Sequence, residues 1–142
     1  MILLPRFLPA LGLTALFGQP LLAQVQQFGT GCPAGTGNVP TIAVRGAPFA
    51  NQPLNFDLTG PAGKFAYLML SASNTQWGAT PLPLSLAAFG NPGCSLLVGP
   101  DLTLVGVFDA QGRASFTLPL ALPASARVYA QAVVFGGHRG AW

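Results

Sequence analysis

The sequence predicts an all-β protein: a single immunoglobulin-like β-sandwich of about seven or eight short antiparallel strands, preceded by a helical signal peptide. Half of the residues are hydrophobic (51%), which is enough to bury a core, while 18 glycines and 14 prolines interrupt the chain too often for long helices. The apolar residues fall in short runs with frequent alternation. Because 142 residues is a common size for one domain, we expect a single core.

The first 23 residues are typical of a secretory signal peptide. Arg6 lies in a short leader, and residues 7–22 form an apolar stretch interrupted by proline and glycine. Ala23 precedes Gln24 and fits a cleavage site, so we expect a secreted, periplasmic or cell-surface protein that begins at Gln24. An uncleaved anchor would need about 20 uninterrupted apolar residues, and no later segment meets that requirement either.

The two cysteines of the chain, Cys32 and Cys94, predict a disulfide. In an oxidising compartment a lone pair of cysteines is expected to be linked. Closing a loop of about 62 residues would stabilise the fold by roughly 4 kcal/mol through the entropy of the unfolded chain. A redox pair more often has the C-x-x-C spacing, and a zinc site needs more ligands than two cysteines and a distant His138.

The mature chain divides into three predicted parts. Residues 24–40 form a lead-in rich in glycine, proline and threonine that is tied down by Cys32, residues 41–135 hold the sandwich, and residues 136–142 form a Gly-rich tail. One helical turn is expected near residues 86–89. The predicted strands are short apolar or alternating runs between turn-forming residues. They cover residues 41–45, 54–59, 65–71, 82–86, 94–98, 102–108, 114–120 and 127–135.

Three segments between these strands have the composition of turns, namely residues 60–63, 91–93 and 109–112. The last of them, from Asp109 to Gly112, predicts a hairpin that joins residues 102–108 to the strand beginning at Arg113. That strand alternates, and its apolar face consists of Ala114, Phe116 and Leu118.

Charge is scarce, because only 6% of the residues are charged where a soluble domain typically carries about 25%. The basic side chains are scattered along the sequence and form no cluster that could follow a phosphate backbone, which excludes nucleic acid as a partner despite a pI near 9.4. These basic residues are Arg6, Arg45, Lys64, Arg113, Arg127 and Arg139.

The titratable residues do not predict an enzyme. The chain offers Asp57, Asp101, Asp109 and His138 with no glutamate, and each aspartate fits a solvated or turn-capping role. No serine lies in a G-x-S-x-G motif, and residues 60–64 lack the serine or threonine that a phosphate loop requires. We therefore expect no cofactor.

A metal site is not expected either. Calcium is the least implausible cation, because Asp101 and Asp109 flank one predicted strand. Seven residues separate the two aspartates, which places their carboxylates about 25 Å apart in an extended chain.

A carbohydrate site is the alternative to a structural or protein-binding role. Trp77 lies in a polar segment with Asn74 and Gln76, and an indole ring with neighbouring amides can stack on a sugar and bond its hydroxyls. The competing interpretation is that Trp77 covers one end of the sandwich.

Several motifs resemble a short extracellular module that recurs in secreted proteins of environmental bacteria, usually near their carboxyl ends. The resemblance covers most of residues 24–135, and it implies a β-sandwich with a link between Cys32 and Cys94 and no known activity. The motifs, in chain order, are Phe28-Gly-Thr-Gly-Cys-Pro, Gly46-Ala-Pro, Pro81-Leu-Pro-Leu-Ser-Leu, Gly90-Asn-Pro-Gly-Cys, Asp109 to Gly112 and Tyr129-Ala-Gln-Ala.

This sequence departs from that pattern after Phe135. Similar sequences continue into a last strand, whereas here a Gly-rich tail follows. We therefore expect the edge of the strand at residues 127–135 to be open, so that the module associates with itself or with other extracellular proteins.

Overall fold

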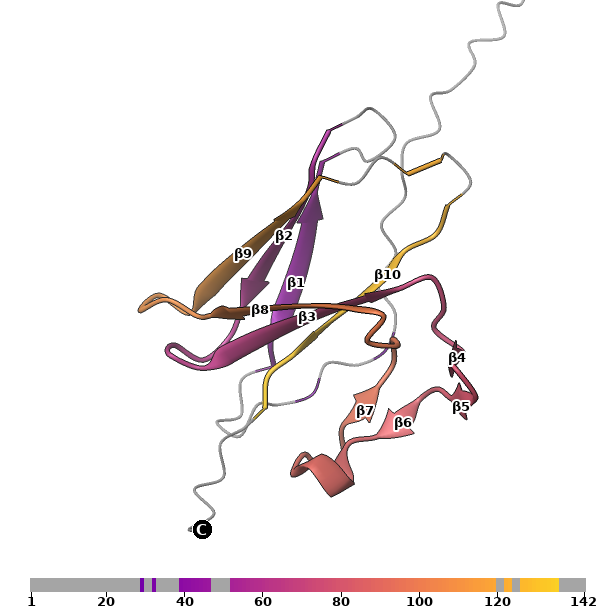
Figure 1. Ribbon diagram of the computed structural model, residues 1–142. Helices are drawn as coiled ribbons and strands as arrows, with labels where there is room; N and C mark the ends of the chain where they lie inside the picture. The colour runs from indigo at the N-terminus through magenta and orange to yellow at the C-terminus, as the bar shows by residue number, and fades with distance from the viewer. Residues whose placement is uncertain are drawn as a thin grey trace, which may run out of the picture.

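The computed structural model describes residues 29, 32, 39–46, 52–119, 122–123 and 126–135. Within these residues the chain forms two three-stranded antiparallel sheets packed face to face (Figure 1). The first sheet has the order β1-β2-β9, from Thr41–Arg45, Leu54–Thr59 and Arg113–Leu118. The second sheet has the order β10-β3-β8, from Tyr129–Val133, Phe65–Ser71 and Leu102–Val107. The predicted all-β sandwich is confirmed.

A small insert, residues 72–101, connects β3 to β8 and contains the remaining elements. The strands β4 (Gln76–Trp77) and β5 (Thr80–Pro81) pair with each other, as do β6 (Leu84–Ser85) and β7 (Ser95–Leu96). The helical turn expected near residues 86–89 is the 3₁₀-helix η2 (Ala87–Phe89). No described helix is long and apolar enough to cross a membrane.

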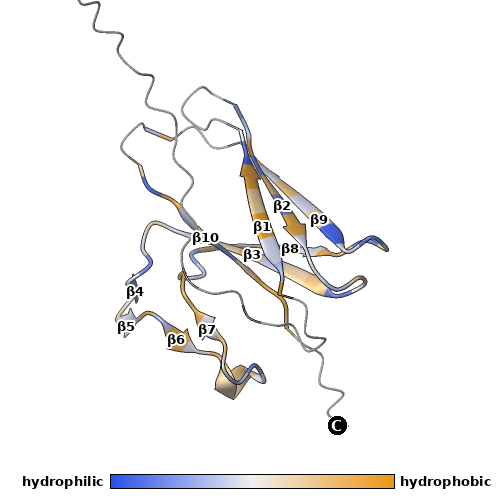
Figure 2. Ribbon diagram, turned by 180° about the vertical axis from the view of Figure 1, so that it is seen from behind, coloured by the Kyte–Doolittle hydropathy of each residue, from blue (hydrophilic) through white to orange (hydrophobic). Residues whose placement is uncertain are grey.

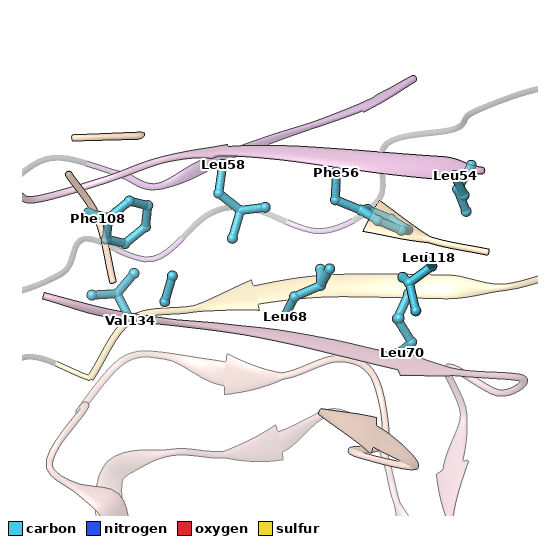
Figure 3. Packing of buried hydrophobic residues seen from close by; sticks show 9 residues of the cluster. Leu54, Phe56, Leu58, Leu68, Leu70, Phe108, Leu118 and Val134 are labelled. Carbon is cyan, nitrogen blue, oxygen red and sulfur yellow. The ribbon is translucent and has the colours of Figure 1, made fainter. Parts of the chain in front are cut away.

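Alternating side chains explain why the sandwich strands form. On β2, the apolar residues Leu54, Phe56 and Leu58 are buried, while the residues between them face outward. Figure 3 shows these three side chains directed from β2 toward Leu68 and Leu70 on β3. The two sheets therefore bury one shared core. Its fully buried members include Phe56, Leu58, Leu68 and Phe108.

The predicted strand bounds agree closely with those of the six sandwich strands. The strands predicted at residues 41–45, 54–59 and 65–71 have the observed bounds, and the other three differ by one or two residues at one or both ends. Within the insert, the predicted strands at residues 82–86 and 94–98 are shortened to two residues each. The signal peptide, most of the lead-in and the tail lie outside the described residues.

The predicted hairpin at Asp109–Gly112 is wrong in its pairing. The turn itself forms, because Asp109 Oδ1 accepts hydrogen bonds from the backbone N–H groups of Gln111 (2.9 Å) and Arg113 (2.8 Å). However, β8 pairs with β3 and β9 pairs with β2, so the turn carries the chain from one sheet to the other. The reason is Phe108, which is buried between the sheets just before the turn and forces the two strands apart.

The turn between β2 and β3 also carries the chain from one sheet to the other, and this second crossing lies beside the crossing at residues 109–112. The carbonyl of Phe108 accepts a hydrogen bond from the N–H of Gly63 (2.9 Å), and the N–H of Phe108 donates to the carbonyl of Lys64 (3.0 Å). The N–H of Gly60 donates to the carbonyl of Gly112 (2.9 Å). This approach requires glycine, since a Cβ on Gly112 would lie 2.4 Å from the Gly60 oxygen and one on Gly60 would lie 2.5 Å from the Phe108 ring.

Candidate functional site

The two outer faces of the sandwich differ in chemistry. The outward side chains of the first sheet are polar and paired: Thr117 donates to Asn55 across the strands (2.8 Å), and the hydroxyls of Thr41 and Thr59 also pair. The outward side chains of the second sheet are largely apolar, and the insert covers part of this face. Figure 2 shows hydrophobic residues in β6 and β7 of the insert. The outer face of the second sheet is therefore the one that leaves large apolar side chains open to solvent, among them Phe65, Val105 and Val107.

The one ion pair in the described part of the chain belongs to the polar face. Arg45 Nε donates to Asp57, and Ser115 Oγ donates to the other carboxylate oxygen at 2.9 Å. The hydrogen bond from Arg45, followed by that from Ser115, holds the pKa of Asp57 below its usual value. The same contact raises the pKa of Arg45. Asp57 thus faces outward, which agrees with the solvated or turn-capping role expected of each aspartate, and it organises the surface of the first sheet.

An open apolar groove lies between the insert and the outer face of the second sheet. Its volume is about 170 Å³, and every side chain that lines it is apolar. Met69 and Val133 form part of its floor, and their side chains are buried by the insert in the same cluster as Leu86 and Leu96. The complete lining consists of Met69, Trp77, Leu84, Leu86, Phe89, Leu96, Pro100, Val133 and Phe135.

Two of the lining aromatic residues remain open to solvent. Trp77 is 43% exposed and Phe89 is 63% exposed. The backbone of Gly99 packs closely on Trp77, since a Cβ there would lie 3.2 Å from the tryptophan Cβ and Cδ1. The insert therefore presents these rings beside a preformed apolar hollow, an arrangement suited to receiving an apolar group.

Gln131 on β10 attaches the insert to the second sheet. Its Oε1 accepts hydrogen bonds from the backbone N–H groups of Leu97 (2.8 Å) and Val98 (3.2 Å). Its Nε2 donates to the carbonyl of Ser95 (3.0 Å). One side chain thus satisfies three backbone groups of the segment that includes β7, which fixes one wall of the groove.

The two ends of the insert are joined by another contact. Ser71, the last residue of β3, is buried and donates its hydroxyl to Asp101, the residue before β8. The same hydroxyl accepts the backbone N–H of Ser73 at 3.0 Å. Asp101 therefore closes the insert at its base, a role that agrees with its predicted position at the entry to a strand.

The disulfide between Cys32 and Cys94 is present, as predicted, with the two Cα atoms 5.5 Å apart. Cys94 follows the turn at residues 91–93 and packs against the apolar cluster beneath the insert. The bond therefore ties the lead-in directly to the insert.

Of the predicted carbohydrate-contact residues, the structure places Trp77 in the groove. Gln76 precedes it on β4 and is exposed, and Asn74 is half-buried in the turn before β4; neither lines the groove. Asp57, Asp101 and Asp109 are each engaged in separate local contacts. In the described part of the chain, no three histidine, cysteine or acidic side chains are grouped as metal ligands, and His138 lies outside it.

Sequence reasoning missed most of the groove. Residues 65–71 are apolar at nearly every position, which is the signal of a strand covered on both faces, and it could have indicated that something packs outside the second sheet. Phe89 and Val133 lie far apart in the sequence and gave no common signal. Searches of protein-family models, curated proteins and solved structures found no match to this chain.

Proposed function

We propose that the chain is a non-catalytic extracellular module that acts through binding, and that the apolar groove beside Trp77 and Phe89 is its recognition surface. The observation that carries the proposal is a hollow lined only by apolar side chains, at which two aromatic rings remain exposed. Such a surface matches an apolar side chain of another protein, because burying that side chain removes hydrocarbon from water on both partners.

Two features support an extracellular location. The leader before Gln24 has the pattern of a signal peptide, and a disulfide such as that between Cys32 and Cys94 persists in oxidising compartments. A non-catalytic role is supported by the aspartates, each of which has a local partner at a different place in the fold. General acid–base chemistry would need at least two such groups directed at one site.

Binding of carbohydrate through Trp77 is the second candidate. The exposed indole could stack on a sugar ring, with Asn74 and Gln76 as neighbouring amides. The all-apolar lining favours the first candidate, since a sugar that entered the groove would leave its hydroxyls without hydrogen-bonding partners.

A fluorescent apolar probe, anilinonaphthalene sulfonate, tests the groove. We expect the purified mature protein to bind the probe, and Phe89→Ser to weaken that binding about tenfold by removing an aromatic contact. Phe65→Ser is the matched control, because Phe65 is similarly exposed (58%, against 63% for Phe89) but does not line the groove. Equal loss of binding in both variants would contradict the assignment of the groove.

Affinity electrophoresis in gels that contain soluble polysaccharides separates the two candidates. Retardation of the wild-type protein that Trp77→Ala abolishes would favour the carbohydrate candidate. Export is tested independently by the mass of the protein recovered outside the cytoplasm, which should correspond to a chain that begins at Gln24.

A further inference from the structure

The strand β8 is an exposed edge of the second sheet. It pairs with β3, and no other described segment pairs with it. Four of its six residues are exposed, whereas none of the five residues of β10, the strand at the opposite edge, is exposed. The exposure of its side chains therefore favours β8 as the accessible edge. The open edge expected at residues 127–135 stays a prediction.

The direction of the unpaired backbone groups on β8 follows from its ladder with β3. Phe108, just after β8, directs both its N–H and its carbonyl toward the β3 side, where they bond Lys64 and Gly63. Because backbone groups alternate in direction along an antiparallel strand, those of Thr103, Val105 and Val107 point toward the open edge. Three residues thus offer a row of donors and acceptors.

Natural sheets usually protect such an edge with charged side chains, proline or a bulge. The sequence of β8, Leu-Thr-Leu-Val-Gly-Val, contains neither charge nor proline, and its ladder with β3 is regular over six residue pairs. Both edge strands of the first sheet, in contrast, carry a charged residue: Arg45 at the end of β1 and Arg113 at the start of β9. The strand β10, Tyr-Ala-Gln-Ala-Val, also lacks charge and proline, but none of its residues is exposed, so β8 is the edge that combines a lack of protection with exposure.

We propose that β8 pairs with β8 of a second copy of the chain, antiparallel about a two-fold axis at Val105. The two second sheets then join into one six-stranded sheet. The pairing sets Val105 against its equivalent and Thr103 against Val107 of the other copy. This inference names one partner for the module proposed above and so rests on its being a binding protein.

Charge complementarity favours a second copy as the occupant and favours antiparallel pairing. Asp101 stands at one end of the β3–β8 pair, and Lys64 stands at the other end, beside Phe108. Asp109 and Arg113 lie at the Lys64 end and offset each other. An antiparallel arrangement places the negative end of one copy against the positive end of the other, whereas a parallel one would oppose like charges.

Apolar side chains on the same face add to the interface. Phe65, Val105 and Val107 are 58%, 55% and 53% exposed, respectively. Tyr67 connects this patch to the groove. Its ring lies beside that of Phe65, with the centroids 6.5 Å apart, and makes an edge-to-face contact with Phe135 of the groove at 5.2 Å. In the paired molecule the two grooves would therefore open on one face of the continuous sheet, so that a partner with repeated apolar groups would be bound twice.

Sedimentation equilibrium of the mature protein, from micromolar to near-millimolar concentration, tests the proposal. We expect a monomer–dimer equilibrium, and we expect Val105→Lys to raise the dissociation constant at least about tenfold by placing two ammonium groups at the axis. Ala43→Lys is the matched control, because Ala43 is an exposed residue at the centre of an edge strand in the first sheet. It should leave the dimer unchanged.

Cross-linking establishes the register. Val105→Cys should form a covalent dimer with a short bis-maleimide, and Ala43→Cys should not. A wild-type protein that remains monomeric throughout overturns the proposal, as does a dimer that Val105→Lys leaves intact. A monomer that still binds the apolar probe in the groove would refute the self-pairing while leaving the proposed function standing.

Discussion

The side-chain oxygen of Gln131 on β10 lies 2.8 Å from the backbone nitrogen of Leu97 in the insert. This contact and its companion at Val98 connect two parts of the fold that are far apart in the sequence. Val98 is fully buried, so its N–H has no access to water if the glutamine is removed.

The first prediction is that Gln131→Ala destabilises the protein by about 2–3 kcal/mol, because it leaves buried backbone donors unpaired. Gln131→Met, which keeps most of the side-chain volume, should be destabilising for the same reason. Chemical denaturation measures both, with Gln111→Ala in an exposed turn as the control. Hydrogen exchange should locate faster opening at residues 95–98. Equal stability of the Gln131 and Gln111 variants would contradict this.

The second prediction concerns the disulfide. Cys94→Ala should cost roughly 2–5 kcal/mol, enough to unfold a marginally stable domain. Cys32→Ala should cost about as much, and the double variant should be little worse than either, because each change removes the same covalent bond. Thiol titration of the denatured, unreduced wild type should find no free thiol. Two reactive thiols per chain would contradict the disulfide between Cys32 and Cys94.

The third prediction isolates the contact between the two sheet crossings. Gly112 and Gly63 have the same φ of 72°, but a Cβ on Gly63 meets nothing within 4 Å, whereas one on Gly112 lies 2.4 Å from a backbone oxygen. Gly63→Ala therefore reports the cost of backbone conformation alone, about 1 kcal/mol. Gly112→Ala should cost clearly more, and thermal unfolding of the two variants measures the difference. Similar melting temperatures would show that the crossings are not tightly packed.

The fourth prediction follows from the lowered pKa of Asp57. A carboxyl whose pKa is lower in the folded state stabilises that state above its ordinary pKa, about 3.9, and loses this contribution as the pH falls through the lowered value. Asp57→Asn should therefore reduce the loss of stability below about pH 4, with a small effect because the pair is exposed. The measurement is urea denaturation from neutral to acidic pH; an unchanged acid limb in the variant would contradict it.

The sandwich strands could be predicted because each buries one face and alternates with a period of two. The two-residue strands β4 and β5 could not, since so short a segment shows no period. The hairpin prediction failed at Phe108 because a turn between strands of one sheet and a turn between two sheets share the same local sequence signals. Whether that phenylalanine enters the core depends on the space left by Gly60, which comes about 50 residues earlier in the chain.

The candidate groove is still less accessible to sequence analysis. Trp77 was identified as a candidate because its side chain is large and its neighbours are polar. Its apolar surroundings come from β3, β10 and several parts of the insert, which only the fold brings together. Gln131 lies in the Tyr129-Ala-Gln-Ala motif. Its three hydrogen bonds to the insert could not be predicted, however, because they depend on where the segment around β7 lies in the fold.

The closure of the insert by Ser71 and Asp101 makes it exchangeable. Because β3 ends and β8 begins side by side, with a hydrogen bond between the two residues, the pairing of these two strands does not require a fixed number of residues between them. The junction is accordingly a natural place to graft a foreign peptide, provided that the graft covers Met69 and Val133 and keeps Cys94 and the backbone groups bonded by Gln131.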